Sequence, residues 1–328
     1  MRSLFFAPLL AVVPCSALAA PLNFDDALAR AVAEAPALRA RALEVGARQS
    51  AAISAGQLPD PKLGVGLDNF PVSGPPAFTY SGDSMTMTRV GISQDVPNLA
   101  KRHARTGRAQ ADITEAEAAR VADERRVRVA TALAWIDLAY AQRRLAAIET
   151  AIGKLARLTS ASVSSVASGS ARPAQSLDIK QGVAALEDRR SEVAAEMARA
   201  RAILSRWTGD PAPDAIGTVP NFTIDPSDLR AAIDGHPDIA VAAARTRQAD
   251  ADVRLARAEK RPDWAFDVAY QRRAERYGDM ISAGVTISLP LFSRRRQDPM
   301  IAASAAVAGA ALARQEDMRR ALAADLEA

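Results

Sequence analysis

Few side chains in this sequence could carry out chemistry, and their spacing does not assemble a catalytic site. The only histidines are His103 and His236. His103 follows Lys101 and Arg102, and such cationic neighbours disfavour the binding of a metal cation. His236 precedes a proline, where we expect a structural role at a helix kink. Because His-Glu-x-x-His, a phosphate-binding loop and Gly-x-Ser-x-Gly do not occur, the sequence predicts that this protein is not an enzyme.

Two methionines, Met85 and Met87, are the remaining candidates for chemistry. Thioether sulfur is a ligand that suits soft cuprous ions. Aligning Gly91 with Gly284 places both methionines on the same strand face as Ser282, which would be the inner face of a channel. The alternative is that they fill space, which is the commoner use of methionine. We therefore predict no resident metal and no cofactor, with these two residues as candidate cation contacts.

Charge and cysteine content exclude several classes of protein. The 328 residues include 42 Lys and Arg against 38 Asp and Glu. The two signs are interspersed, whereas nucleic-acid binding requires basic residues gathered on one face, so no nucleic-acid partner is expected. Cys15 is the only cysteine, and it falls within a segment that is expected to be removed. Disulfides and thiolate metal sites are therefore not expected.

Residues 1–19 have the pattern of a secretory signal peptide. A positive start at Arg2 precedes an apolar run from Leu4 to Val13, and small residues at Ala17 and Ala19 match a cleavage site. No later apolar stretch reaches the length of about 18 residues that a transmembrane helix needs. If this chain crosses a membrane, it must therefore do so as a closed β-barrel.

The elements that position these residues occur twice. Four landmarks recur in the same order, two at an offset of 201 residues and two at an offset of 193: Pro36 and Pro237, Pro61 and Pro262, Gly91 and Gly284, Pro97 and Pro290. Such repetition indicates an internal repeat. The predicted parts are a first repeat, a connector and a second repeat, at residues 20–208, 209–226 and 227–328.

Long helices are predicted after the second strand of each repeat. From residue 98 to about 168 there is no proline, and apolar residues at alternating spacings of three and four form a coiled-coil seam: Leu138, Ala141, Leu145, Ile148, Ile152 and Leu155. Seventy residues of helix would be roughly 105 Å long. Gly169 and Pro173 then break the helix. We therefore expect an antiparallel helical hairpin over residues 98–208 with its tip near Gly169.

Strand patterns occupy about 61–69, 84–95, 262–272 and 280–290. Apolar and polar residues alternate in them, as in transmembrane barrel strands and also in half-buried soluble sheets. We expect a lipid-facing set in the last strand: Ile281, Val285, Ile287 and Leu289. Four strands cannot close a membrane barrel, for which about eight are the minimum. Several copies of the chain must therefore pool their strands.

Basic residues follow both strand pairs at the start of the next helix. They are Lys101, Arg102, Arg294, Arg295 and Arg296. Because cationic side chains are favoured where a membrane meets water, we expect this set at the headgroups. The alternative is ordinary solubilising surface charge.

These features together resemble the TolC-type outer-membrane efflux family. The matching pieces are the opening Leu22-Asn23-Phe24-Asp25-Asp26-Ala27-Leu28, the two helix-strand-strand-helix repeats, the Gly-x-x-x-x-x-Pro junctions and the turn at residues 167–178. The resemblance implies an α+β membrane protein in which three chains form a twelve-stranded transmembrane β-barrel and a coiled-coil tunnel of α-helical hairpins. It implies location in the bacterial outer membrane, with the tunnel in the periplasm, and partners in outer-membrane lipid, a periplasmic adaptor and an inner-membrane pump of the RND class.

The same resemblance assigns the hairpin tip to adaptor docking. The residues at this tip are Gly169, Ser170, Arg172, Leu177 and Asp178. A narrower resemblance, carried by residues 68–72 and 84–91, is to ducts paired with heavy-metal pumps and implies metal cations as cargo. The second repeat is expected to be truncated, because the counterpart of the first tip would fall near residue 362 and the gate residues beyond residue 328.

Two alternatives remain open at the level of sequence. A periplasmic coiled-coil adaptor would have one helical hairpin flanked by β-domains, which does not match the twofold repeat. A structural coiled-coil envelope protein would explain the helices but not the alternation from Ile281 to Leu289. The pattern therefore favours a passive duct, although neither the cargo nor the cognate pump can be read from it.

Overall fold

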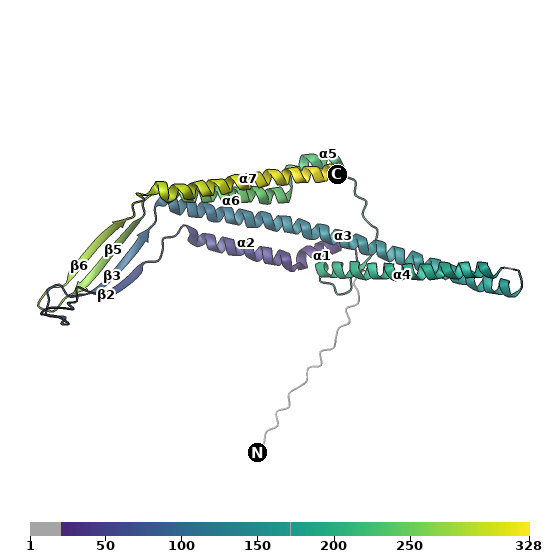
Figure 1. Cartoon of the computed structure of the whole chain (residues 1–328), viewed down its shortest axis with the longest axis horizontal. Helices are drawn as coiled ribbons and strands as arrows, with labels where there is room; N and C mark the ends of the chain where they lie inside the picture. Colours follow the sequence, from purple (N-terminus) through teal and green to yellow (C-terminus); the bar gives the residue numbers. More distant parts are fainter. Residues whose placement is uncertain (1–20, 171) are drawn as a thin grey trace, which may run out of the picture. The chain divides into compact units, whose positions relative to one another are not determined.

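The structure, a computed structural model, describes residues 21–170 and 172–328. The predicted signal peptide, residues 1–19, lies outside the described residues. The chain divides into two compact units, one formed by residues up to 39 and 123–223, the other by residues 40–122 and 224–328. The predicted combination of long helices and a few short strands is confirmed (Figure 1).

The second unit contains a four-stranded antiparallel sheet. Its strands are β2 (Lys62–Asp68), β3 (Met87–Val96), β5 (Trp264–Arg272) and β6 (Met280–Ile287). Their order in the sheet is β2-β3-β5-β6, so the two hairpins lie side by side through β3 and β5. Each outer strand, β2 or β6, has a neighbour on one side only within the described chain.

The two hairpins differ in register by two residues. In the first hairpin Lys62 pairs with Ser93. The repeat offsets would carry this pair to Asp263 and Thr286, but Thr286 pairs with Ala265. The repeat read from the proline and glycine positions is therefore not strict within the strands. Because side chains alternate with a period of two, a shift of two residues leaves every side chain on its expected face.

Helices follow and precede these strands in the same unit. They are α2 (Pro36–Ala55), the first part of α3 (Leu99–Ala167), α5 (Pro226–Ala232), η1 (Ile233–Gly235), α6 (Pro237–Ala258), η2 (Ser293–Arg295) and α7 (Gln297–Glu327). Helices α6 and α7 run side by side (Figure 1). Ion pairs link the two ends of this pair, with Lys260 Nζ 2.7 Å from Asp298 Oδ1 and Arg319 Nε 2.7 Å from Asp234 Oδ1.

The first unit is a helical hairpin with a small core. It contains α1 (Phe24–Glu34), the rest of α3 and α4 (Pro173–Thr208), and a short parallel pair of β1 (Pro21–Leu22) and β4 (Asp214–Ala215). Trp135, Leu138 and Leu204 are fully buried in the core. The indole Nε1 of Trp135 donates to the carbonyl oxygen of Leu22 at 2.8 Å, which ties β1 to α3.

The predicted seam of α3 is buried only in part. Leu138 and Ala141 are buried, whereas Leu145, Ile148, Ile152 and Leu155 are half-buried. Helix α4 is the antiparallel neighbour, and Arg144 of α3 pairs with Glu196 of α4 at 2.8 Å. A two-helix hairpin covers one side of each seam, so half-burial is what this geometry provides.

Candidate functional site

One face of the four-stranded sheet is apolar across all its strands. The register places directly opposite residues on the same face, so alternate residues of the strands combine into one surface. The large apolar residues of this apolar sheet face are Leu63, Val65, Leu67, Val90, Ile92, Trp264, Phe266, Val268, Tyr270, Ile281, Val285 and Ile287, and the polar residues Thr88, Gln94 and Arg272 lie toward its two ends. All twelve apolar side chains are exposed. A continuous exposed apolar surface of this kind marks an interaction with lipid or with another protein.

The opposite face carries polar and very small residues. This polar sheet face includes Asp68, Arg89, Gly91, Ser93, Asp95, Asp267, Gln271, Ser282, Gly284 and Thr286. Two of the glycines leave room for their neighbours. A Cβ atom on Gly91 would lie 2.8 Å from Ala269 Cβ, and one on Gly284 would lie 2.6 Å from Asp267 Oδ1. One face of the sheet is therefore apolar and the other polar. A sheet that contacts lipid on one side and water on the other would need this difference.

The four residues predicted to face lipid are all exposed. Ile281, Val285 and Ile287 lie on the apolar sheet face, and Ile281 and Val285 expose 76% and 57% of their surface. Leu289 follows the end of β6 and exposes 63%. Thr286, between Val285 and Ile287, belongs to the polar sheet face. Adjacent residues of β6 therefore offer a direct comparison of the two faces.

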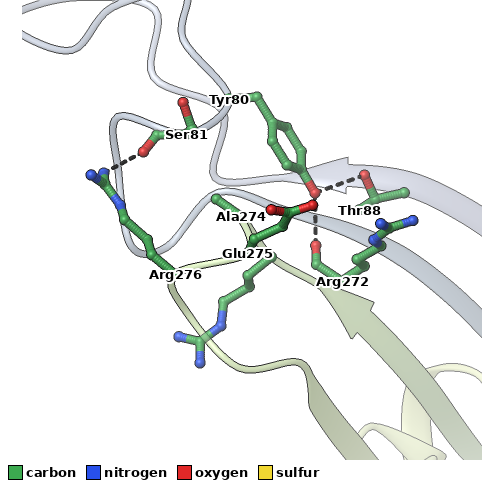
Figure 2. A pocket seen from close by; sticks show the side chains of 8 residues that line it. Tyr80, Ser81, Thr88, Arg272, Ala274, Glu275 and Arg276 are labelled. Atoms are coloured by element: carbon green, nitrogen blue, oxygen red, sulfur yellow. Dashed lines mark hydrogen bonds between the residues drawn. The ribbon is translucent and has the colours of Figure 1, made fainter.

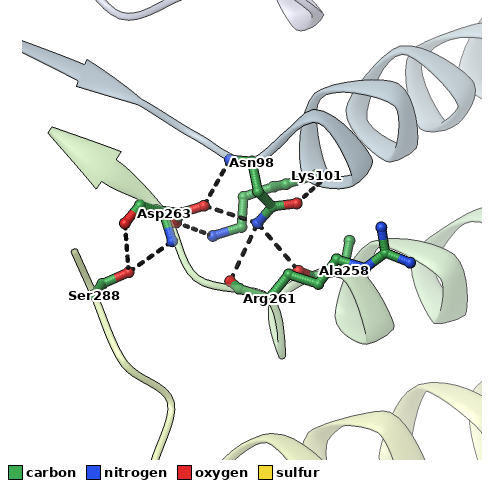
Figure 3. A network of polar contacts seen from close by, with 6 residues as sticks. All are labelled: Asn98, Lys101, Ala258, Arg261, Asp263 and Ser288. Carbon is green, nitrogen blue, oxygen red and sulfur yellow. Dashed lines mark hydrogen bonds and ion pairs between the residues drawn. The ribbon is translucent and has the colours of Figure 1, made fainter.

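A polar cluster joins the sheet to the helices at the end of β3 (Figure 3). Asn98 donates from its side-chain Nδ2 and its backbone N–H to Asp263 Oδ1, both at 2.8 Å. Its Oδ1 accepts from the backbone N–H of Lys101 at 2.8 Å and so caps α3. Lys101 Nζ lies 2.5 Å from Asp263 Oδ2. The backbone N–H of Asp263 donates to Ser288 Oγ at 2.9 Å, which brings in the end of β6.

The charge state of Asp263 follows from these contacts. Partial burial by itself would raise the pKa of this carboxyl group, because it disfavours the charged form. The hydrogen bonds from Lys101 and Asn98 outweigh that effect and hold the pKa of Asp263 below its ordinary value. Asp263 is therefore an anion at neutral pH, bound to a cation from the other repeat.

The predicted basic set is divided by the structure. The side chain of Lys101 is only 13% exposed and pairs with Asp263, and Arg102 donates from Nε to the carbonyl oxygen of Gly56 at 3.0 Å. The remaining members, Arg294, Arg295 and Arg296, lie in and just after η2 and are exposed. The structure thus gives Lys101 and Arg102 partners within the chain and leaves Arg294, Arg295 and Arg296 on the surface.

A second basic group was not identified from the sequence. Arg254, Arg257 and Arg261 line a groove of 390 Å³ between α6 and α3, together with His103. The spacing of three and four residues, which places side chains on one helix face, is the signal that could have revealed it. This groove, rather than a metal site, is the environment of His103.

The turn between α3 and α4 has the geometry that the sequence predicts for a helix end. Gly169 has φ of +78°, in the left-handed region that favours glycine. The backbone N–H of Ser170 donates to Ser165 O at 2.9 Å and that of Gly169 to Val166 O at 3.1 Å, a Schellman arrangement. Pro173 opens α4. The candidate docking residues Arg172, Leu177 and Asp178 are exposed.

The methionines do not gather with other ligands. Met85 precedes β3 and is 53% exposed, whereas Met87 is buried on the polar sheet face opposite Asp68. Within the described residues, no group of three or more His, Cys, Asp or Glu side chains is arranged to hold a metal ion. Nor does any helix of residues 21–170 and 172–328 have both the length and the apolar composition to cross a membrane.

A hollow of 650 Å³ lies at the end of the sheet away from the helices (Figure 2). Its lining comes from the loop between β2 and β3, from the loop between β5 and β6, and from Thr88 of β3 and Arg272 of β5. Tyr80 OH donates to the carbonyl oxygen of Arg272 at 2.8 Å and lies 3.2 Å from Thr88 Oγ1. Arg276 donates to the carbonyl oxygen of Ser81. The two hairpins are therefore joined at this end as well.

Comparisons with known proteins identify the fold. The family described as outer membrane efflux protein matches residues 229–328, the part from α5 to α7. A comparison with curated protein sequences finds no match.

Solved structures resemble nearly the whole chain. A membrane protein from Pseudomonas aeruginosa superposes with a TM-score of 0.76 at 17% identity, over 91% of this chain and 73% of its own. The CmeC outer membrane channel of Campylobacter jejuni gives 0.73 at 12% identity, over 91% and 70%. The outer membrane protein VceC of Vibrio cholerae gives 0.70 at 18% identity, over 90% and 75%. This chain has the fold of outer-membrane efflux channels, and its residues 229–328 match the family of outer membrane efflux proteins.

Proposed function

We propose that this chain is a subunit of an outer-membrane efflux channel. The observation that carries the proposal is the sheet: its apolar face is exposed on all four strands, and its outer strands β2 and β6 each lack one neighbour in the described chain. Burial of apolar side chains in lipid would stabilise such a face. The family match at residues 229–328 and the shared channel fold support the same role.

The proposed assembly is a homotrimer. An open strand edge in lipid leaves backbone N–H and C=O groups without partners, so membrane sheets close into barrels. Four strands are too few, since membrane barrels have about eight or more. In the proposed trimer β6 of one subunit pairs with β2 of the next, and twelve strands close the barrel.

The proposed tunnel is built from the helices that follow the strands. Helix α3 starts three residues after β3 and ends 68 residues later at the turn around Gly169. In the proposed arrangement this turn lies in the periplasm and meets the adaptor, which connects the duct to an inner-membrane pump. The chain acts as a passive conduit and not as an enzyme, and the polar sheet face lines its outer-membrane part.

Val285 and Thr286 provide the test of this function. Arginine in place of Val285 is expected to cost about 2–4 kcal/mol in lipid and to reduce outer-membrane insertion and heat-modifiable oligomers. Arginine in place of Thr286 is expected to be tolerated, because that side chain faces the aqueous interior. The measurement is membrane fractionation with electrophoresis of unheated samples. Equal tolerance at the two positions would rule out the membrane assignment.

We propose heavy-metal cations as the cargo, on the resemblance carried by residues 68–72 and 84–91. A strain without its own duct, supplied with this one and its pump and adaptor, is expected to gain tolerance to copper or zinc salts. Met85→Ala and Met87→Ala are expected to leave that tolerance unchanged if the methionines only fill space. Tolerance gained to an organic antibiotic and to neither metal would contradict the cargo assignment and leave the duct assignment standing.

A further inference from the structure

One arginine lies on the apolar sheet face at its loop end. Arg272 is the last residue of β5, and the alternation of that strand puts it on the face of Phe266, Val268 and Tyr270. It pairs with Thr88 of β3. Among the described residues, the guanidinium of Arg272 makes no hydrogen bond and no ion pair. The guanidinium therefore stands at the border of an exposed apolar surface without a hydrogen-bond or ion-pair partner among the described residues.

Two further arginines, Arg273 and Arg276, line the hollow next to it, and Figure 2 labels Arg276. Arg273 donates from Nε to the carbonyl oxygen of Gly278 at 2.6 Å. The guanidinium of Arg276 lies 4.8 Å from the centre of the Tyr277 ring. Both are thus held by uncharged groups. Each keeps its positive charge, and each also retains N–H groups for an additional acceptor.

The two loops at this end also carry three carboxylates, Glu275, Asp279 and Asp83, as many as the arginines of the group. Asp83 accepts from the backbone N–H of Met85 at 3.1 Å. Glu275 lines the hollow with the three arginines. Asp279, in the same loop, accepts from Tyr270 OH and, at 3.2 Å, from the backbone N–H of Arg273. These hydrogen bonds from Tyr270 and Arg273 hold the pKa of Asp279 below its ordinary value, and the positive charges of Arg272 and Arg273 add to this effect. No ion pair joins any of the three carboxylates to an arginine of this group in the part of the chain that the structure describes. The three arginines therefore keep guanidinium N–H groups that no carboxylate of the described residues engages, beside an apolar surface.

We propose that this loop-end arginine site, Arg272 with Arg273 and Arg276, binds the phosphate of a membrane glycolipid of the lipid A class. Arginine presents a planar fork of donors that matches phosphate. The adjoining apolar residues Tyr270, Ile281 and Val90 would contact the acyl chains, so an amphiphile uses both parts of the surface. A free anion would use the arginines alone.

The inference rests on the proposed function for the orientation of the sheet. With the helices in the periplasm, the loop end of the strands lies in the outer leaflet, where the phosphate-bearing lipid is lipid A. The binding itself can be measured without reference to export. Because the guanidinium of Arg272 makes no hydrogen bond or ion pair with the described residues, and its backbone contacts with Tyr80 and Thr88 do not involve the side chain, Arg272→Ala is expected to remove the ligand contact without disturbing the loop.

The experiment measures binding of bisphosphorylated lipid A to the purified protein in detergent, by native mass spectrometry. We expect Arg272→Ala to weaken binding about tenfold, in line with the loss of a charge-assisted hydrogen bond. Arg272→Lys keeps the positive charge but not the planar fork of donors. Its affinity for lipid A is expected to lie between those of Arg272→Ala and the unaltered protein. Arg48→Ala, which removes another exposed arginine of the same unit, is the matched control and is expected to bind as the unaltered protein does.

Two results would overturn the inference. One is binding by Arg272→Ala as tight as that of the unaltered protein. The other is equal binding of dephosphorylated lipid A, or of inorganic phosphate at the same concentration as lipid A. If oligomers and outer-membrane insertion persist in either case, only the lipid site fails. If the protein does not enter the outer membrane at all, the proposed function fails instead.

Discussion

At the scale of single residues, Asp263 is the charged centre of the junction between sheet and helices. It binds Lys101 and Asn98, which belong to the other repeat and lie 162 and 165 positions away. Its carboxylate therefore links the first repeat to the second at this end of the strands, beside the bonds from Asn98 Nδ2 to the carbonyl oxygens of Ala258 and Arg261. The pairing of Lys62 with Asp95 at 2.6 Å joins only neighbouring strands and is more exposed.

Stability is expected to depend on pH through Asp263. Its pKa is lowered in the folded chain, so its contribution is complete above the ordinary carboxyl value of about 3.9 and is lost as the pH falls below that value. Asp263→Asn is expected to destabilise the protein by about 1–2 kcal/mol at pH 7. The difference in unfolding free energy between this variant and the unaltered protein is expected to shrink as the pH falls from 5 to 3. Thermal unfolding in detergent at a series of pH values measures it.

Asp95→Asn is the control for this experiment. An exposed ion pair is worth about 0–1 kcal/mol, so this variant is expected to unfold close to the unaltered protein. A cost at Asp95 equal to that at Asp263 would contradict the special role of the junction. A difference at Asp263 that does not change with pH would show that its charge is not what stabilises the fold.

Gly91 is expected to be required for the contact between the two hairpins. An added Cβ would meet Ala269 Cβ at 2.8 Å and Val268 O at 3.1 Å, and β3 and β5 would have to move apart. Gly91→Ala is expected to cost about 1–3 kcal/mol, as overpacking does. Gly64→Ala is the matched control on the adjacent strand, because its Cβ would meet nothing closer than 4.0 Å. Thermal unfolding of both variants would contradict the argument if Gly64→Ala were the more damaging.

At the scale of elements, the turn between α3 and α4 depends on one backbone conformation. Gly169→Ala places a side chain in the left-handed region and is expected to cost about 1–2 kcal/mol. Gly153→Ala, inside α3 where an added Cβ meets nothing within 4 Å, is expected to gain about 0.5–1 kcal/mol instead. Amide hydrogen exchange along the hairpin measures both effects. If both substitutions stabilised the hairpin, or both destabilised it, the left-handed conformation at Gly169 would not be what distinguishes the two positions.

The docking proposal has its own prediction at this turn. Charge reversal at Arg172 or Asp178 is expected to reduce crosslinking to the adaptor, because charged rim residues guide association. Oligomer yield is expected to stay unchanged, since these side chains are exposed and the sheet is a separate element. Charge reversal at Arg157, an exposed residue of α3, serves as control. Unchanged crosslinking in both tip variants would place the adaptor contact elsewhere.

At the scale of the whole molecule, the repeat predicts how subunits meet. Gln94 pairs with Phe266 inside the chain. The offset of 193 carries Gln94 to Ile287, and the offset of 201 relates Phe266 to Val65. Ile287 of one subunit is therefore expected to face Val65 of the next. Because the two hairpins differ in register by two residues, the contact between subunits could also be shifted by two. Ile287 would then face Leu63 or Leu67, which lie on the same face of the sheet as Val65.

Engineered cysteines measure this register. The described chain contains no cysteine, so a pair introduced at Ile287 and at one of Leu63, Val65 or Leu67 can only react with itself. We expect an oxidised oligomer that withstands heating in detergent for at least one of the three pairs. Ile287 paired with Gly64 or Gly66 is the control, because those glycines lie on the polar sheet face. Crosslinking through the glycines alone would contradict the proposed subunit contact.

The sequence by itself determined the features that depend on neighbouring residues. Strand alternation fixed which side chains of β6 share a face, because the period of two is a local property of the backbone. The turn at Gly169 followed from a glycine and a proline within five positions, and the long helices from the scarcity of helix breakers. The strands expected at about 61–69 and 262–272 are found at Lys62–Asp68 and Trp264–Arg272.

Only the tertiary structure decided what depends on distant residues. The strand order, which places β3 against β5, brings Lys101 to Asp263 and forms an ion pair between the two repeats that the sequence did not indicate. The same pairing set Arg272 at the border of the apolar sheet face, where its guanidinium forms no hydrogen bond or ion pair with the described residues. Register between hairpins is chosen by the packing of side chains from both, and the period of a single strand carries no information about that choice.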